Sequence, residues 1–109
     1  MSTIYHITSR EAWKQVKDNS TFEPSSLSSE GFVHCSTKEQ LLVVLNRFFK
    51  NAEEVLILEI DTGKLSSKLI FEISDGESFP HIYGAINISS VRKTHLLDFK
   101  EKGKFKINF

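Results

Sequence analysis

GFVHCSTKEQ, at residues 31–40, is the stretch of sequence that best predicts the fold. Its first half, residues 32–36, is expected to form a strand. Thr37 and Gln40 then have the spacing of a capping box, in which a threonine begins a helix and a glutamine three residues later bonds back to it. The helix is predicted to run to about residue 50, because apolar side chains recur at helical spacing at Leu41, Leu42, Leu45, Phe48 and Phe49.

Before this stretch, the sequence predicts an earlier strand followed by a helix. Residues 3–7 are rich in β-branched and aromatic side chains and are expected to form the strand. Thr8 and Glu11 again have the spacing of a capping box, and they predict a helix that ends near residues 18–19. Residues 21–31 are polar, with a proline and several serines, and are interpreted as a surface loop.

After residue 50, strands are expected to dominate, with turns at residues 61–63 and 74–76. The basic tail from residue 100 has alternating apolar side chains and is interpreted as a strand at a sheet edge. Since helices come early and strands late, the sequence predicts an α+β fold with a mixed or antiparallel sheet, as one domain over residues 1–109. The strands predicted in this half are residues 55–61, 69–73, 86–91 and 95–99.

The composition limits the classes of function. The 109 residues carry 14 basic and 14 acidic side chains, and a formal net charge of zero argues against a general nucleic-acid or anionic-membrane binder. One cysteine excludes an internal disulfide and a cysteine-rich zinc module. No apolar run approaches the ~20 residues of a membrane span, and residues 1–6 lack the pattern of a signal peptide. We therefore expect a cytoplasmic protein with neither a membrane nor a nucleic-acid partner.

Three of the four histidines lie in short apolar or aromatic segments, which makes them the main candidates for chemistry. Side chains alternate between the two faces of a strand, so His6 shares a face with Thr8, and His34 with Ser36. If residues 79–84 are extended, a third histidine shares a face with a tyrosine. Convergence of the three faces would form one cleft with hydrogen-bonding and proton-transfer groups, namely His6, His34, Ser36, His81 and Tyr83.

Other interpretations of these residues stay open. A histidine in a strand is often a structural hydrogen-bonding group, and Tyr83 can be a core ring. The three histidines can hold zinc, as in a metal hydrolase, but no local ligand spacing supports a metal site, and none is predicted. Cys35 points away from His34 on a strand, so a buried structural cysteine is favoured over a nucleophile.

Two charged residues complete the candidate set. Glu72 is flanked by apolar residues, and alternation places it on the face opposite Phe71 and Ile73. It is either a functional carboxylate or part of the polar face of a half-exposed strand. Arg47, on the predicted amphipathic helix, is either a clamp for a phosphate or carboxylate or a solvated surface residue.

Several of these segments together resemble a bacterial family, the domain-of-unknown-function family 952. They are IYHIT at residues 4–8, GFVHCST at residues 31–37 and FPHIYG at residues 79–84, with Trp13, Gln40, Arg47 and Glu72 between or beside them. The resemblance runs from about residue 3 to residue 92. It implies a small relative of the ADP-ribosyltransferase fold, which is a split antiparallel sheet with two main helices packed outside.

The resemblance also implies roles for individual residues. In that larger group a first-strand histidine often contacts the ribose of NAD, and by this resemblance His6 would have that role here. His34 with Ser36 would line the nicotinamide pocket, and Glu72 would be the catalytic glutamate. The family's catalytic glutamate usually lies on a later strand, near residues 79–84, where this sequence has none. The ligand-binding set expected on this basis is His6, His34, Ser36, Thr37, Arg47, His81 and Tyr83.

Two functions follow as hypotheses. In the first, the chain is an enzyme of ADP-ribosyl or phosphoryl transfer type that acts on NAD or a related ADP-ribosyl or phosphorylated nucleotide, with His6, His34 and Glu72 as catalytic residues. In the second, the chain is a non-catalytic module that binds a small molecule or a protein. The absence of a complete acid, base and nucleophile set favours the second, and a fold alone does not decide between them.

Overall fold

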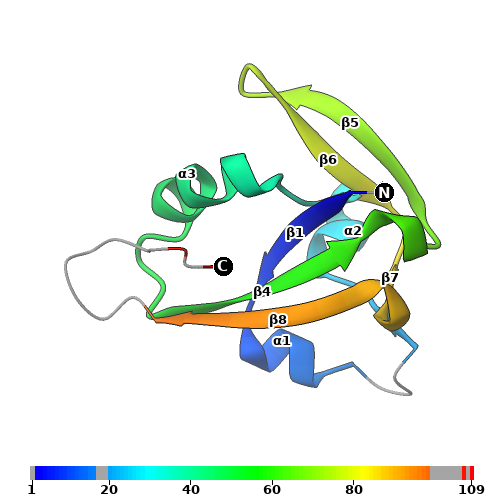
Figure 1. Ribbon diagram of the computed structural model, residues 1–109, viewed down its shortest axis with the longest axis horizontal. Helices are drawn as coiled ribbons and strands as arrows, with labels where there is room; N and C mark the ends of the chain where they lie inside the picture. Colours follow the sequence, from blue (N-terminus) through cyan, green and yellow to red (C-terminus); the bar gives the residue numbers. More distant parts are fainter. Residues whose placement is uncertain (1, 17–19, 99–106, 108) are drawn as a thin grey trace.

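The computed structural model describes residues 2–16, 20–98, 107 and 109, and it places antiparallel sheets between short helices (Figure 1). The elements are, in chain order, β1 (Thr3–Thr8), α1 (Arg10–Lys14), β2 (Thr21–Phe22), α2 (Ser25–Glu30), β3 (Val33–His34), α3 (Lys38–Phe48), β4 (Glu54–Asp61), η1 (Thr62–Lys64), β5 (Lys68–Ser74), β6 (Glu77–Tyr83), β7 (Ile86–Asn87), η2 (Ile88–Ser90) and β8 (Val91–Asp98). The predicted α+β class and antiparallel pairing are confirmed, because every named strand pair is antiparallel.

A single backbone bridge joins the two larger sheets. One sheet has the strand order β1-β4-β8 and the other β3-β6-β5, while β2 and β7 form a separate pair. Tyr5 and Ser36 each donate a backbone N–H to the carbonyl of the other, at 2.8 Å in both directions. No further pairing of named strands joins β1 to β3 within the described residues. Among the described residues, backbone pairing therefore joins the two sheets at one point, while side chains of both sheets, such as Ile4 and Val33, pack in one core cluster.

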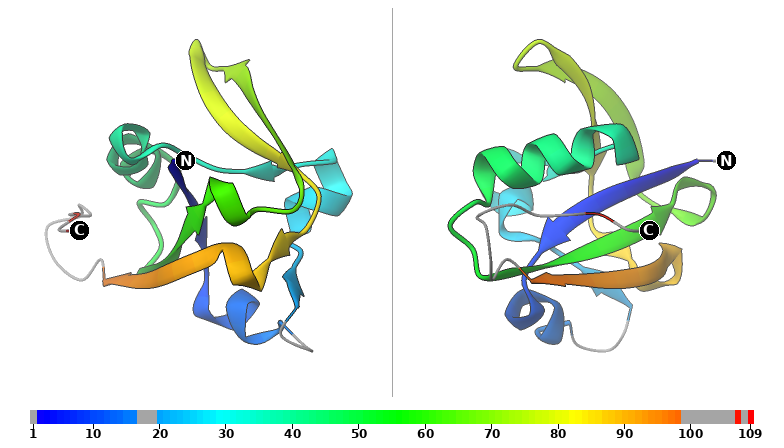
Figure 2. Two further views of the ribbon diagram at one scale, coloured as in Figure 1. Left: turned by 45° about the vertical axis from the view of Figure 1, so that its right-hand side comes forward. Right: turned by 60° about the vertical axis from the view of Figure 1, so that its left-hand side comes forward.

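Side-chain alternation on the β1-β4-β8 sheet explains its two cores. One face carries Ile4 and Leu58, and α1 packs against it through Trp13. The opposite face carries Tyr5 and Ile57, and α3 covers it (Figure 2). The core cluster under α3 consists of Tyr5, Leu41, Leu45, Val55 and Ile57. The cluster on the other face consists of Ile4, Phe22, Val33, Cys35, Leu56, Leu58, Ile60, Ile82 and Ile86.

The two predicted capping boxes have different outcomes. Around α3 the prediction is confirmed: the Thr37 hydroxyl accepts from the backbone N–H of Gln40, and the Gln40 side chain accepts from that of Thr37. The prediction at Thr8 is wrong, since Thr8 still pairs with β4 as the last residue of β1. Ser9 caps α1 instead, at 3.0 Å from the N–H of Ala12. That helix ends at Lys14, earlier than predicted, and residues 17–19 lie outside the described part.

The predicted loop over residues 21–31 is wrong, because that segment contains β2 and the short helix α2. Gly31 ends α2 in the left-handed conformation, with φ of 89°, which glycine adopts without strain. The strand predicted over residues 86–91 is also wrong. Within it only β7 and Val91 are extended, because η2 lies between them. Val91 is the first residue of β8, which pairs along β4 and begins before residue 95, where the sequence predicted a strand to start.

The hairpin of β5 and β6 projects away from the rest of the fold (Figures 1 and 2). Its two-residue turn has positive φ at Asp75 (53°) and Gly76 (81°), as the twist of a tight hairpin requires. Residues 79–83 are extended within β6, as the grouping of His81 with Tyr83 required.

The predicted edge strand in the tail lies largely outside the described residues. Ile107 and Phe109 are described, and both pack beside the core cluster under α3. No helix among the described residues is both long enough and apolar enough to cross a membrane.

Candidate functional site

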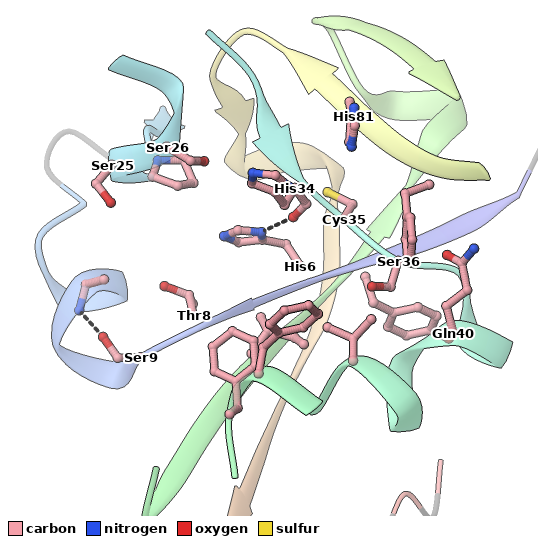
Figure 3. A pocket seen from close by; sticks show the side chains of 18 of the residues that line it. His6, Thr8, Ser9, Ser25, Ser26, His34, Cys35, Ser36, Gln40 and His81 are labelled. Carbon is pink, nitrogen blue, oxygen red and sulfur yellow. Dashed lines mark hydrogen bonds between the residues drawn. The ribbon is translucent and has the colours of Figure 1, made fainter. Parts of the chain in front are cut away.

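A cleft of about 1070 Å³ opens near the point where β1 and β3 diverge. One side is formed by α3, with Val43, Arg47 and Phe48, and the other by α1 and the start of α2 (Figure 3). Tyr83, which was expected in this cleft, does not line it, but all three histidines of the predicted set do. They are His6, His34 and His81.

His6 is the most strongly constrained of the three histidines. Its side chain is buried, and its Nδ1 lies 2.7 Å from the backbone carbonyl oxygen of His34. Because a carbonyl only accepts, Nδ1 carries the hydrogen. Burial lowers the pKa of His6 to about 4, although the hydrogen bond to His34 opposes this shift. The ring is therefore neutral at pH 7, with an unprotonated Nε2.

The unprotonated Nε2 of His6 faces the cleft. It has no hydrogen-bond partner among the described residues. Figure 3 shows Thr8, Ser25 and Ser26 at this end of the cleft, on the side of the ring away from His34. Their hydroxyls have no partner in the described part of the chain either, and each can both donate and accept. This end of the cleft thus presents one obligate acceptor among three adaptable hydroxyl groups.

His34 and His81 form a second group with Phe32. The two histidines are directly opposite each other on β3 and β6, with ring centroids 5.5 Å apart. The ring of Phe32 stacks on His81 at 4.2 Å and meets His34 edge-on at 4.8 Å. His34 is exposed, and its Nε2 lies 3.0 Å from a carboxylate oxygen of Glu30. Aromatic surface therefore continues from the cleft onto the hairpin.

Glu72 lies beside this aromatic group and does not line the cleft. One of its carboxylate oxygens accepts from Tyr83 Oη at 2.6 Å and from His81 Nδ1 at 2.7 Å. These two hydrogen bonds, the one from Tyr83 first, lower the pKa of Glu72, and the bond to Glu72 raises the pKa of Tyr83. Glu72 is thus an ionised carboxylate that orients His81 from behind the cleft, and the structure does not bring it together with His6.

The remaining candidates occupy different surroundings. Ser36 is buried at the bridge to β1 and lines the cleft. Thr37 does not line it, because its hydroxyl caps α3. Arg47 lines the cleft and lies over the Phe48 ring at 5.4 Å, with no carboxylate partner among the described residues. Cys35 is buried, and burial raises its pKa, so its thiol is protonated and unreactive at neutral pH.

Ser25 and Ser26 line the cleft but were not among the predicted site residues. Ser25 and Ser26 were missed because they belong to a helix that sequence periodicity does not reveal, and their position after a proline is the only local signal. Within the described residues no three histidine, cysteine, aspartate or glutamate side chains are grouped as ligands for a metal ion.

Comparison with solved structures shows close similarity over nearly the whole chain. The crystal structure of CC0527 from Caulobacter crescentus has 29% sequence identity and a TM-score of 0.84, with 96% of this chain and 94% of that chain covered. The solution NMR structure of CC0527 has 30% identity and a TM-score of 0.79, with 95% and 91% covered. No curated protein matches the chain significantly.

The family of the chain follows from its sequence. The profile of DUF952, described as a protein of unknown function, matches residues 7–94. This match covers most of the chain, so the chain belongs to the DUF952 family.

Proposed function

We propose that the cleft binds a nucleotide through its ribose, and that the ligand is NAD or a related ADP-ribosyl or phosphorylated nucleotide. The observation that carries the proposal is the state of His6: it is buried and neutral, and its Nε2 faces the cleft as an acceptor. An acceptor fixed in this way selects a ligand that donates a hydrogen bond. A ribose hydroxyl is such a donor, and it can also accept from the hydroxyls of Thr8, Ser25 or Ser26.

The other end of the cleft supports the nucleotide class. Arg47 is a cation with no described carboxylate partner, and a guanidinium binds phosphate in a two-pronged geometry. Phe48 beside it is 61% exposed and offers a ring on which a base can stack. Ribose at His6 and phosphate at Arg47 is therefore the orientation that we propose.

The architecture is consistent with this proposal. The resemblance to the ADP-ribosyltransferase fold implies a split antiparallel sheet. Here the bridge between Tyr5 and Ser36 is the only backbone pairing between the two larger sheets among the described residues. The cleft lies beside that bridge, where the resemblance leads us to expect the nucleotide.

A non-catalytic binding module is the second candidate, and the position of Glu72 favours it. Its carboxylate is held by His81 and Tyr83 and lies outside the cleft lining, so it is not aimed at a ligand bound to His6. Catalysis by His6, His34 and Glu72 stays a prediction. Product formation from NAD would support the enzyme, and saturable binding without turnover would support the module.

Calorimetric titration with NAD and with ADP-ribose tests the proposal. His6→Asn is the decisive variant, because an asparagine amide can keep the hydrogen bond to the His34 carbonyl while it removes the Nε2 acceptor. We expect Kd to rise about tenfold, the effect of losing one hydrogen bond to a buried group. His95→Asn, on β8 and outside the cleft, is the matched control and should bind as the wild type does. No saturable binding of either nucleotide at millimolar concentration would overturn the proposal.

A further inference from the structure

The outer edge of β5 is an unpaired strand edge. In the order β3-β6-β5, only one side of β5 is hydrogen-bonded to a neighbour. The two-residue turn makes Ser74 and Glu77 a hydrogen-bonded pair, so the backbone groups of every second residue from Ser74 point toward β6. Those of Leu69, Phe71 and Ile73 therefore point outward. No described residue pairs with them, and Figure 1 shows β5 on the outside of the hairpin.

The side chains of the same three residues form an apolar row, which is exposed at Phe71 and Ile73 and partly buried at Leu69, where it packs against the core cluster that contains Ile82. Phe71 is 50% exposed and Ile73 is 75% exposed, and both lie on the face opposite Glu72. Native edge strands are commonly protected by an inward charge, a proline or a bulge. The pairing of β5 with β6 has no bulge, and β5 contains no proline. Its two charged residues are Lys68, at its first residue, and Glu72, whose carboxylate is already bonded to His81 and Tyr83.

We propose that β5 pairs with β5 of a second copy of this chain, antiparallel and about a two-fold axis at Phe71. In this register Phe71 lies opposite the partner's Phe71, and Leu69 lies opposite the partner's Ile73. The three residues of each copy whose backbone groups point outward are then all in hydrogen-bonded pairs with the partner. The two β3-β6-β5 sheets become one continuous sheet across the axis.

The charges and symmetry of β5 favour a second copy over another partner. On the other face, this register places Ile70 opposite the partner's Glu72 and Lys68 opposite the partner's Ser74, so no two like charges are directly opposed. The formal net charge of the chain is zero, so two copies do not repel each other at long range. The apolar row is its own complement when reversed, as an interface about a two-fold axis requires.

The dimer is expected to be weak. One strand pair buries less than the ~1,200 Å² at the lower limit of stable specific interfaces. The dimer should therefore dissociate on dilution. The cleft does not include Leu69, Phe71 or Ile73, so pairing at this edge is independent of the function proposed above.

Sedimentation velocity from micromolar to millimolar concentration tests the dimer. We expect the wild type to show a dimer fraction that rises with concentration. Phe71→Lys places two like charges on the axis and should raise the dimer Kd more than about tenfold, with the helix and strand content unchanged. Leu96→Lys is the matched control, since Leu96 is a 46% exposed side chain on β8, the edge strand of the other sheet. It should leave the dimer intact.

A second variant tests the register without introducing a charge. Phe71→Cys places two thiols across the axis, at the Cα separation of ~5.5 Å that a disulfide accepts. Mild oxidation should give a covalent dimer, while the wild type, whose Cys35 is buried, should give none. A wild type that stays monomeric at millimolar concentration, a Phe71→Lys variant that dimerises as the wild type does, or a Phe71→Cys dimer that is not cross-linked would each overturn the proposal.

Discussion

The side chain of His6 is hydrogen-bonded to the backbone of His34, with 2.7 Å between Nδ1 and the carbonyl oxygen. This contact spans the split between β1 and β3, close to the bridge of Tyr5 with Ser36. It fixes the tautomer of His6, because the carbonyl accepts only from a protonated Nδ1. One structural hydrogen bond thus determines which group His6 offers to the cleft.

Burial of neutral His6 predicts a specific dependence of stability on pH. Its pKa is about 4 in the folded state against an ordinary value of 6.5, so the unfolded chain binds more protons between these values. The free energy of unfolding should therefore fall as pH drops from about 6.5 to 4, by about 3 kcal/mol from this group. Urea unfolding at several pH values measures it. His6→Asn should lose this part of the dependence, and an unchanged slope in the variant would contradict the assignment.

Thr37 is predicted to act as a helix cap and not as a ligand-binding group. Thr37→Ala removes the hydroxyl that accepts from Gln40 at 3.3 Å, and should lower the free energy of unfolding by about 1 kcal/mol. Thr37→Ser keeps the hydroxyl and is the control, with nearly wild-type stability. Since Thr37 does not line the cleft, nucleotide affinity should be the same in both variants. Weaker binding by Thr37→Ala alone would restore the ligand-binding role.

The ionised carboxylate of Glu72 is predicted to control the titration of Tyr83. Its hydrogen bond raises the pKa of Tyr83, so Glu72→Gln should lower that pKa toward the ordinary value for tyrosine. An NMR titration of the Tyr83 ring measures the change, with Tyr5 as an internal reference. Because Glu72 lies outside the cleft lining, we expect little change in nucleotide affinity. Glu72→Asp, which keeps the charge on a shorter side chain, should give a pKa of Tyr83 between those of the wild type and of Glu72→Gln.

The core cluster under α3 is expected to dominate the stability of that helix. Leu45 is fully buried and contacts this cluster, so Leu45→Ala should cost about 2 to 5 kcal/mol in the free energy of unfolding. Leu42 on the same helix is 41% exposed, and Leu42→Ala should cost much less. Denaturant unfolding compares the two. Equal losses would mean that α3 does not pack as described.

Features set by neighbouring residues could be predicted from the sequence. The capping box of Thr37 with Gln40 and the turn at Asp75 and Gly76 depend on local bonding and φ preferences, and both are confirmed. The short elements could not be predicted, because β2 and β7 exist only through mutual pairing of residues 21–22 with residues 86–87. Tertiary contacts decide such elements more than propensity does.

As with the fold, the local features of the candidate site could be predicted from the sequence, and those that depend on tertiary contacts could not. Strand alternation gave the face of each strand on which His6, His34 and His81 lie, but only the structure shows that all three line one cleft. The same capping pattern that predicts α3 already assigns the Thr37 hydroxyl to the helix, which weakens its role as a ligand-binding group. Ser25 could not be included, since α2 was interpreted as a loop. The tautomer of His6 depends on a carbonyl 28 residues away, which no sequence pattern specifies.

The most direct test of the central claim is to measure the ring nitrogen shifts of His6 by NMR, first alone at pH 7 and then with NAD. We predict a neutral ring with the hydrogen on Nδ1, and an Nε2 signal that shifts saturably as the nucleotide binds while the signals of His95 stay in place. A ring with the hydrogen on Nε2, or an Nε2 signal that does not respond to millimolar NAD, would contradict the proposal that His6 receives the ribose.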